Sequence, residues 1–247
     1  MNLPSKPSYS LDVILVSNAT TPALRAMSQR AIESAGTQAR VIMLESNPSV
    51  SYEGATTLHP QVPFAYNAYL NIGARAGTGQ YIFFGNNDLL FTPGWEAALI
   101  GAMRENGVAS ASPLCPRSHA PLGLRAHSGV LAGDQVFERF CGWAFMWTRA
   151  LFEEAGGLDE TFTFWCSDNA TVAQLQKRKQ AHLLVTDSVV HHLGGGSNTI
   201  DGLDAGTTYQ YTVAEISKYN QVYDQHLRID GSWRLPANLA LDPPQNP

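Results

Sequence analysis

Short, continuous apolar runs alternate with amphipathic segments in the N-terminal part of the chain. Residues 11–16 and 40–44 are apolar runs of the length typical of buried strands. Between them, Thr21 followed by Pro22 is a strong helix start, because threonine caps the first turn and proline suits its first position. Apolar residues then recur on one helical face up to Gly36. A strand, a helix and a strand with continuous apolar strands predict a parallel, right-handed βαβ unit.

Two further helices and one strand follow from the same pattern. Residues 62–77 predict a helix, which leads into an apolar strand starting at Tyr81. Residues 94–106 are amphipathic and end at Gly107, a residue type that commonly terminates helices. This second helix is expected to be scaffold.

The remaining segments carry weaker patterns. Residues 110–139 break into short pieces rich in Pro, Gly, Ser and His, which fit either an acceptor-binding loop over a site or a solvated surface connection. Residues 202–229 carry apolar positions that predict a C-terminal helix packed outside the sheet. Residues 236–247 contain four prolines and few core-forming residues, so we expect an extended or disordered tail.

Composition is that of one ordinary globular domain. The chain has 247 residues, of which 44% are hydrophobic and 15% charged, enough to bury a sizeable core. Its formal net charge of -5 provides no general attraction to nucleic acid or anionic membrane. The longest early apolar run, residues 13–16, is too short for a signal or membrane helix, so we expect a cytoplasmic protein without membrane insertion. Cys115, Cys141 and Cys166 lack Cys-x-x-Cys spacing, which predicts reduced, buried thiols.

The strongest candidate for chemistry is the polar run Asn86-Asn87-Asp88. It follows the apolar residues 81–84 and precedes the apolar residues 89–91. A carboxylate at the end of a buried strand is well placed to hold a divalent cation against a diphosphate. The alternative is a turn, because Asn and Asp side chains bond their own backbone and tolerate left-handed conformations.

Further segments follow Asp88 in a characteristic order. They are residues 142–149 leading into 151–160, residues 162–169, and residues 189–197. Together with residues 86–88 they resemble an inverting, family-2-type glycosyltransferase of the GT-A fold. Residues 86–88 resemble the family's D-x-D-type metal motif, and residues 156–160 resemble its glycine-rich GG-x-D-E stretch. Residues 167–168 resemble its E-D base motif, and residues 192–194 resemble its late metal-binding H-x-G motif.

This resemblance covers residues 9 to 200, and it implies a fold and a domain organisation. The implied fold is α/β of the GT-A (Rossmann-like) type, with a mixed, mainly parallel sheet flanked by helices. Residues 9–200 would form the glycosyltransferase domain, 201–235 its C-terminal helical extension, and 236–247 a disordered tail. The Phe-x-Phe-Trp-x-x-Asp-Asn sequence of residues 162–169, with Gly142-Trp143 before it, further resembles a phage-encoded branch.

The implied metal ligands are Asp88 and His192. Oxygen and imidazole ligands suit Mn²⁺ better than Ca²⁺, with Mg²⁺ as the alternative. The alternative for His191 and His192 is a pair of adjacent strand residues, one buried and one exposed; because successive strand side chains face opposite ways, only one of them should point at the metal. The His-x-Gly spacing selects His192. Because Asn86 stands where many relatives have Asp, the site has fewer anionic ligands, and we expect weak metal affinity without donor phosphates.

Inversion requires a base that removes a proton from the acceptor hydroxyl, and the resemblance assigns this role to Asp168. A positioned base of this kind contributes about a hundred- to ten-thousand-fold to a rate. The alternative is that Asp168 N-caps a helix over residues 169–179, a common role for Asp. Both roles are compatible, because backbone amides at a helix start favour the ionised carboxylate.

Ligand contacts are assigned by the same resemblance, which places Ser17 and Asn18 after the first strand, and Glu45 after the second, near the donor nucleotide. The family usually has Asp where this chain has Glu45. The full donor-binding set comprises Ser17, Asn18, Glu45, Asn71, Asn86, Asn87 and Trp143. The acceptor set comprises Trp165, Asn169, Arg117 and Arg125. Trp143 and Trp165 can stack on sugar or base faces, and core packing is their alternative; for Asn71, the alternative is helix packing.

The sequence therefore predicts a hexosyl- or pentosyltransferase that uses a nucleotide-diphosphate sugar, with UDP as the expected nucleotide, and a divalent metal. The expected acceptor is a glycan or a hydroxymethylated base of phage DNA, in the cytoplasm of a bacterium or a phage-infected cell. A nucleotidyltransferase is the first alternative, but it should show a Gly-rich, basic phosphate loop where this chain has Ser17 to Thr21. A non-catalytic nucleotide-sugar-binding module is the second, but it should lose the base or the metal ligands, and Asp88, Asp168 and His192 are all present.

Overall fold

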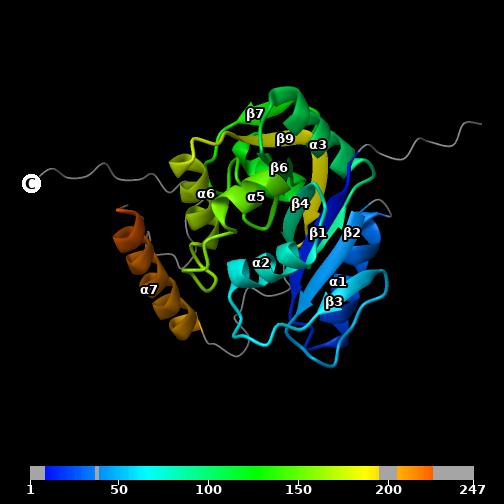
Figure 1. Cartoon of the computed structure of the whole chain (residues 1–247), viewed down its shortest axis with the longest axis vertical. Helices are drawn as coiled ribbons and strands as arrows, with labels where there is room; N and C mark the ends of the chain where they lie inside the picture. The colour runs from blue at the N-terminus through cyan, green and yellow to red at the C-terminus, as the bar shows by residue number, and fades with distance from the viewer. Residues whose placement is uncertain (1–8, 37–38, 195–204, 225–247) are drawn as a thin grey trace, which may run out of the picture.

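The structure is a computed structural model, which describes residues 9–36, 39–194 and 205–224. Its described part is built around a nine-stranded sheet with helices on both faces (Figure 1). The strand order is β3-β2-β1-β4-β8-β6-β9-β5, with β7 paired to β9. This mixed α/β architecture confirms the predicted fold class.

The N-terminal half of the sheet is parallel. Its elements are β1 (Leu11–Ser17), α1 (Pro22–Ala35), β2 (Ala39–Glu45), β3 (Ala55–Leu58), α2 (Tyr66–Ala76) and β4 (Tyr81–Asn86). β1 pairs in parallel with both β2 and β4, which confirms the predicted βαβ unit. Helix α1 starts as its sequence predicts, because Thr21 Oγ1 accepts a hydrogen bond from Leu24 N at 3.3 Å.

The second half mixes parallel and antiparallel pairs. Its strands are β5 (Leu89–Phe91), β6 (Ser110–Leu114), β7 (Val130–Ala132), β8 (Ala144–Thr148) and β9 (His182–His192). Its helices are α3 (Trp95–Asn106), α4 (Pro116–His119), a 3₁₀ turn η1 (Ala120–Leu122), α5 (Arg149–Ala155), α6 (Ser167–Lys177) and α7 (Ala205–Tyr223). β8 runs antiparallel to β4 and β6, whereas β6 and β9 are parallel.

Three predicted elements have different bounds in the structure. The helix expected over residues 62–77 spans Tyr66–Ala76; Pro63 disfavours helical backbone at Val62, and the chain up to the extended Ala65 is not helical. Residues 110–139 are not merely a loop, since β6 lies fully buried between β8 and β9. The C-terminal helix expected within residues 202–229 is described from Ala205 and ends at Tyr223, before the turn at Asp224; residues 202–204 and 225–229 lie outside the described residues. The predicted tail, residues 236–247, lies outside the described residues.

Apolar side chains fill both faces of the sheet. On one face, α1 and α3 pack over alternate residues of β1 such as Val13 and Leu15. On the other, α2 and α5 pack over Ile14 and Val16. Gly73 allows α2 to lie this close, because a Cβ there would stand 2.4 Å from Ile14 Cγ2. The three cysteines are buried free thiols.

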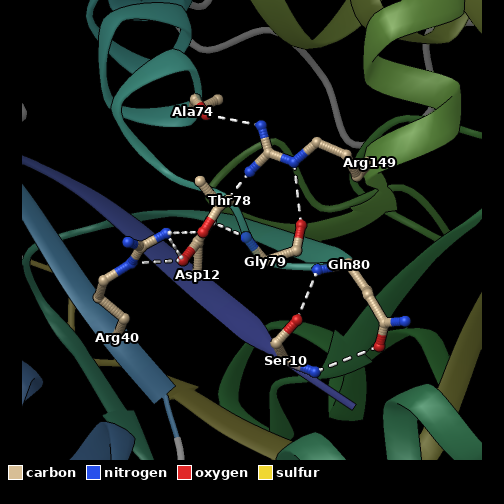
Figure 2. Close-up of polar contacts among 8 residues, drawn as sticks. All are labelled: Ser10, Asp12, Arg40, Ala74, Thr78, Gly79, Gln80 and Arg149. Atoms are coloured by element: carbon tan, nitrogen blue, oxygen red, sulfur yellow. Dashed lines mark hydrogen bonds and ion pairs between the residues drawn. The ribbon is translucent and has the colours of Figure 1, made fainter.

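A buried charge ties the elements together at the start of β1 (Figure 2). Asp12 is 1% exposed and lies between Arg40 of β2 and Arg149 of α5, at 2.7 and 2.9 Å. It also accepts a hydrogen bond from Gly79 N at 2.6 Å. A Cβ at Gly77 would stand 2.2 Å from the Asp12 carboxylate, so the loop before β4 depends on glycine for this approach. None of the described helices has the length and apolar character that crossing a membrane requires.

Candidate functional site

The candidate site lies where β4 and β9 end and α6 begins. A cavity of about 160 Å³ opens there, with aromatic, amide, imidazole and carboxylate groups in its wall. Its lining residues are Tyr66, Asn86, Phe137, Gly142, Trp143, Phe164, Trp165, Cys166, Ser167, Asp168 and His192. Four of the predicted site residues at separate places in the sequence therefore line one cavity: Asn86, Trp143, Asp168 and His192. Trp165 belongs to the same wall.

Asp88 and His192 come together through strand pairing. Leu89 of β5 lies opposite His192 of β9, and Leu193 N donates to Asp88 O at 2.9 Å. As a result, Asp88 Oδ1 stands 3.2 Å from His192 Nε2. Both His191 and His192 are partly buried, so the alternative of one buried and one exposed histidine is wrong. Both histidines are the last two residues of β9, and at this strand end neither side chain is fully covered by its neighbours.

This pair fits a divalent cation. Asp88 is 5% exposed, and its Oδ1 has no hydrogen-bond partner among the described groups, an unusual state for a buried carboxylate oxygen. Two ligand atoms at a right angle around a cation, with bonds of about 2.1 Å, stand about 3 Å apart. The described residues hold no group of three or more His, Cys, Asp or Glu side chains suited to a metal ion. Asp88 and His192 would therefore share the cation with water or ligand oxygens.

Neighbouring side chains fix the orientation of His192. The Trp143 ring stacks on the imidazole with ring centroids 4.8 Å apart and an interplanar angle of 6°. Asn86 Nδ2 lies 3.4 Å from His192 Nε2, and Asn86 Oδ1 accepts a hydrogen bond from the Tyr66 hydroxyl at 2.8 Å. A histidine that is held in this way presents its ring nitrogen to one place, as a metal ligand requires.

Asp168 lies in the first turn of α6, on the cavity wall. The helix begins at Ser167, and its N-cap is Cys166, so the interpretation of Asp168 as N-cap of a helix over residues 169–179 is wrong. Cys166 instead adopts left-handed backbone with φ +62°, which turns the chain sharply into the helix. Strained residues of this kind cluster at functional sites. Gly142 makes room for the carboxylate, because a Cβ there would stand 2.5 Å from Asp168 Cβ.

The Asp168 carboxylate has an altered acidity. Burial raises the pKa of Asp168 from 3.8 to about 6, although the backbone amide of Asn169 donates to Oδ1 at 2.8 Å and partly opposes this rise. A base with a pKa just below neutral pH is ionised in most molecules and still accepts a proton readily. Its position and its pKa both suit general base catalysis.

Unpaired polar atoms gather beside Asp168. Trp165 Nε1, Ser167 Oγ and Asn169 Oδ1 are buried and lack hydrogen-bond partners in the described structure. Buried polar groups are nearly always paired, so such a cluster calls for a bound partner or water. Trp165 and Ser167 also line the cavity, so their unpaired atoms can bind hydroxyl groups of a ligand there.

Ser17, Asn87 and Glu45 lie in a buried network behind the site. Asn87 Nδ2 donates to Ser17 Oγ at 3.2 Å and to Ser28 Oγ at 2.8 Å. Glu45 is 0% exposed, and Tyr52 OH donates to its carboxylate at 2.6 Å. The Glu45 carboxylate also accepts from the backbone N–H of residues 19 and 47, at 3.0 and 2.8 Å. This network anchors the loop after β1, on which Asn18 is exposed.

Asn71 lies outside the cavity lining and holds the glycine-rich stretch. Its amide is fully buried, donates to Leu158 O and Glu160 Oε1 at 2.8 and 2.7 Å, and accepts from Leu158 N at 2.8 Å. Gly157 has φ +101°, and a Cβ there would lie 3.0 Å from Asn71 Oδ1. Asn71 thus shapes the backbone of residues 157–160.

The two arginines of the predicted acceptor set, Arg117 and Arg125, belong to different segments of the chain. Arg117 of α4 is exposed, and its Nη1 donates to Leu193 O, directly after His192. Arg125 is exposed in the segment between η1 and β7. Asn169 is 7% exposed beside Asp168, at the start of α6.

Six of the lining residues are absent from the predicted site set: Tyr66, Phe137, Gly142, Phe164, Cys166 and Ser167. Phe164 lies within the aromatic motif of residues 162–169, which is the sequence signal for its place in the cavity wall. Phe137 has φ +69°, and no sequence signal marks that backbone. Tyr66 looks like an ordinary apolar helix residue, and only the hydrogen bonds of its hydroxyl to Asn86 and Gly142 reveal its place.

Comparison with known proteins adds to this geometry. No family model matches the chain, and no curated protein matches it. Among solved structures, the fold is similar to GalNAc-T7 with UDP, GalNAc and Mn²⁺, at a TM-score of 0.58 and 12% identity over 87% of this chain and 50% of that one. It is also similar to the mannosyltransferase PcManGT of Pyrobaculum calidifontis in complex with GDP-Man and Mn²⁺, at a TM-score of 0.57 and 16% identity over 86% of this chain and 64% of that one.

The chain thus spans less than two thirds of the length of either neighbour. At these identities the similarity concerns the fold, which is that of GT-A glycosyltransferases, with a central mixed sheet flanked by helices. This bears out the GT-A fold that the sequence motifs imply.

Proposed function

We propose that this chain is a metal-dependent glycosyltransferase that moves a sugar from a UDP-sugar to an acceptor hydroxyl, with inversion at the anomeric carbon. One observation carries the proposal: Asp88 Oδ1 is buried, accepts no hydrogen bond from the described groups, and stands 3.2 Å from His192 Nε2, at a cavity that His192 and Asp168 line. The GT-A neighbours support it, because each was solved with a nucleotide or nucleotide sugar and Mn²⁺.

The roles of the residues follow from their chemistry. Mn²⁺ or Mg²⁺, held by Asp88 and His192, would supply Lewis-acid stabilisation of the leaving diphosphate. Asp168 would remove the proton of the acceptor hydroxyl while that oxygen attacks the anomeric carbon opposite the leaving group, which inverts the configuration. Trp143 keeps the His192 ring in place.

Donor and acceptor would occupy different parts of the site. Asn18 and Asn86 would contact the donor directly, whereas Ser17, Glu45 and Asn87 would act by anchoring the loop that carries Asn18. The flat faces of Trp143 and Trp165 suit a sugar ring or a base. The acceptor would be a glycan or a hydroxymethylated base of phage DNA, and Arg117 and Arg125 are exposed cations available to an anionic acceptor.

A substrate screen tests the proposal. Purified protein is incubated with Mn²⁺ and a panel of UDP- and GDP-sugars, and nucleotide release is measured alone and with oligosaccharide or hydroxymethylated DNA. The expected result is metal-dependent hydrolysis of one donor, faster release with one acceptor class, and a product of inverted anomeric configuration by NMR. Absence of both donor binding and release across the panel would reject the function.

The metal pair gives a separate prediction. Asp88→Ala removes the only carboxylate of its motif, so Mn²⁺-stimulated donor binding in calorimetry should be lost while circular dichroism stays that of the folded protein. His192→Ala should weaken the same binding more than His191→Ala, its matched control. Equal effects of the two histidine variants would remove His192 from the metal site.

A further inference from the structure

The C-terminal helix α7 lies against the segment that forms one wall of the cavity. Ile216 and Tyr219 of α7 pack with Phe162, Cys166 and Ala170 in a small hydrophobic cluster separate from the two main cores. The Phe162 ring is fully buried, with its centroid 5.8 Å from that of Tyr219. The described part of α7 therefore docks through apolar contacts on the residues that lead into α6.

A buried carboxylate adds a polar clamp to this apolar contact. Glu215 of α7 is 7% exposed, and its two oxygens accept hydrogen bonds from the backbone N–H groups of Thr163 and Phe164, at 2.5 and 3.2 Å. These amides belong to an irregular segment, where no strand or helix partner satisfies them. One side chain of α7 thus supplies the hydrogen bonds that the segment lacks.

The clamped segment leads directly to the reacting groups. Phe164 and Trp165 line the cavity, and Cys166 follows with its left-handed backbone before Asp168. A residue in this conformation persists only when its surroundings hold it there. A second hydrogen bond holds this segment from α2, where Tyr66 N donates to Thr163 O at 2.7 Å.

We propose that Glu215 is a positioning residue for the acceptor side of the site, holding residues 163–166 so that Trp165 and Asp168 face the cavity. The inference rests on the proposed function, and it names α7 as part of the acceptor-binding machinery. The candidate metal ligands lie elsewhere, Asp88 in the turn between β4 and β5 and His192 at the end of β9. Loss of the clamp therefore acts on acceptor use and spares donor binding.

Glu215→Gln is the test, because glutamine keeps the size of the side chain but turns an NH₂ group towards one of the two backbone N–H donors. Hydrogen–deuterium exchange of peptides covering residues 161–166 should become faster, while exchange in β1 and β4 stays unchanged. The KM for the acceptor should rise about ten- to a hundredfold. The KM for the donor should stay near wild type. Ser217→Ala, exposed on the same helix, is the control and should match wild type throughout.

Each outcome is decisive. Unchanged exchange in residues 161–166 would show that Glu215 does not hold the segment. Faster exchange combined with equal changes in both KM values would mean a general structural role, and would overturn the positioning role. If the wild-type protein transfers no sugar at all, the proposed function fails and the acceptor role falls with it, whereas the exchange data still decide whether the clamp exists.

Discussion

Asp168→Asn is expected to lower the single-turnover rate of sugar transfer by roughly two to four orders of magnitude, the usual contribution of a positioned general base. Asparagine keeps the size of the side chain, and its carbonyl oxygen can still accept the hydrogen bond from Asn169 N. The negative charge is lost, and with it the ability to take a proton. Single-turnover conditions ensure that product release does not mask the chemical step.

The same variant should not lose stability. Because burial raises the pKa of Asp168 to about 6 in the folded protein, ionisation of this carboxyl weakens folding as pH rises from about 4 to 6. A neutral side chain removes that effect, so the melting temperature at pH 7 should equal or exceed that of wild type. Asp187→Asn, at an exposed position of β9, is the matched control and should leave transfer unchanged. Wild-type transfer by Asp168→Asn would exclude Asp168 as the base.

The pH dependence of transfer follows from the same carboxyl group. The base must be ionised to accept a proton, so below a pKa of about 6 the value of kcat/KM for the acceptor should rise with pH and then level off. This rising limb is the sign expected for a base, whereas a general acid would give a falling limb. A rate that is flat between pH 5 and 7 would contradict the assignment.

Local signals predicted the parts of the fold that depend on local chemistry. Thr21 and Pro22 define the start of α1, and Gly107, with φ +63°, ends α3. Strand β6 escaped prediction because its sequence, Ser-Ala-Ser-Pro-Leu, has little strand character. Its pairing with β8 and β9 buries every one of its residues. The burial of β6 results from its pairing with distant strands, so its own short, polar sequence does not indicate it.

The same distinction holds for the candidate site. The motif resemblance selects Asp88 and His192, and the structure places their side chains 3.2 Å apart. The motifs do not reveal which groups from distant parts of the sequence bind a side chain in the folded protein. The resemblance assigns Glu45 to a contact with the donor nucleotide, yet Tyr52 and two backbone amides bind its carboxylate from inside the protein. Likewise, the pKa of Asp168 depends on burial, which its own sequence neighbourhood does not reveal.

The largest effect on stability is expected from Asp12→Ala. This carboxylate is almost fully buried and holds Arg40, Arg149 and the backbone of Gly79, so it joins β1 to three other parts of the chain (Figure 2). Removing one partner of a buried ion pair leaves an uncompensated charge and costs about 3–5 kcal/mol. Urea unfolding, followed by circular dichroism, measures this loss of the free energy of unfolding.

The two arginines provide the graded controls. Arg40 is 45% exposed, so Arg40→Ala should cost at most about 1 kcal/mol, as for ordinary surface pairs. Arg149 is 17% exposed and also donates to the carbonyl oxygens of Gly79 and Ala74, so Arg149→Ala should come close to Asp12→Ala. Asp12 precedes Ser17 by five residues on β1, about 17 Å along the strand, so the folded Asp12→Ala protein should keep its donor affinity. A loss of stability below that of Arg40→Ala would show that the Asp12 network does not hold the sheet and its loops together.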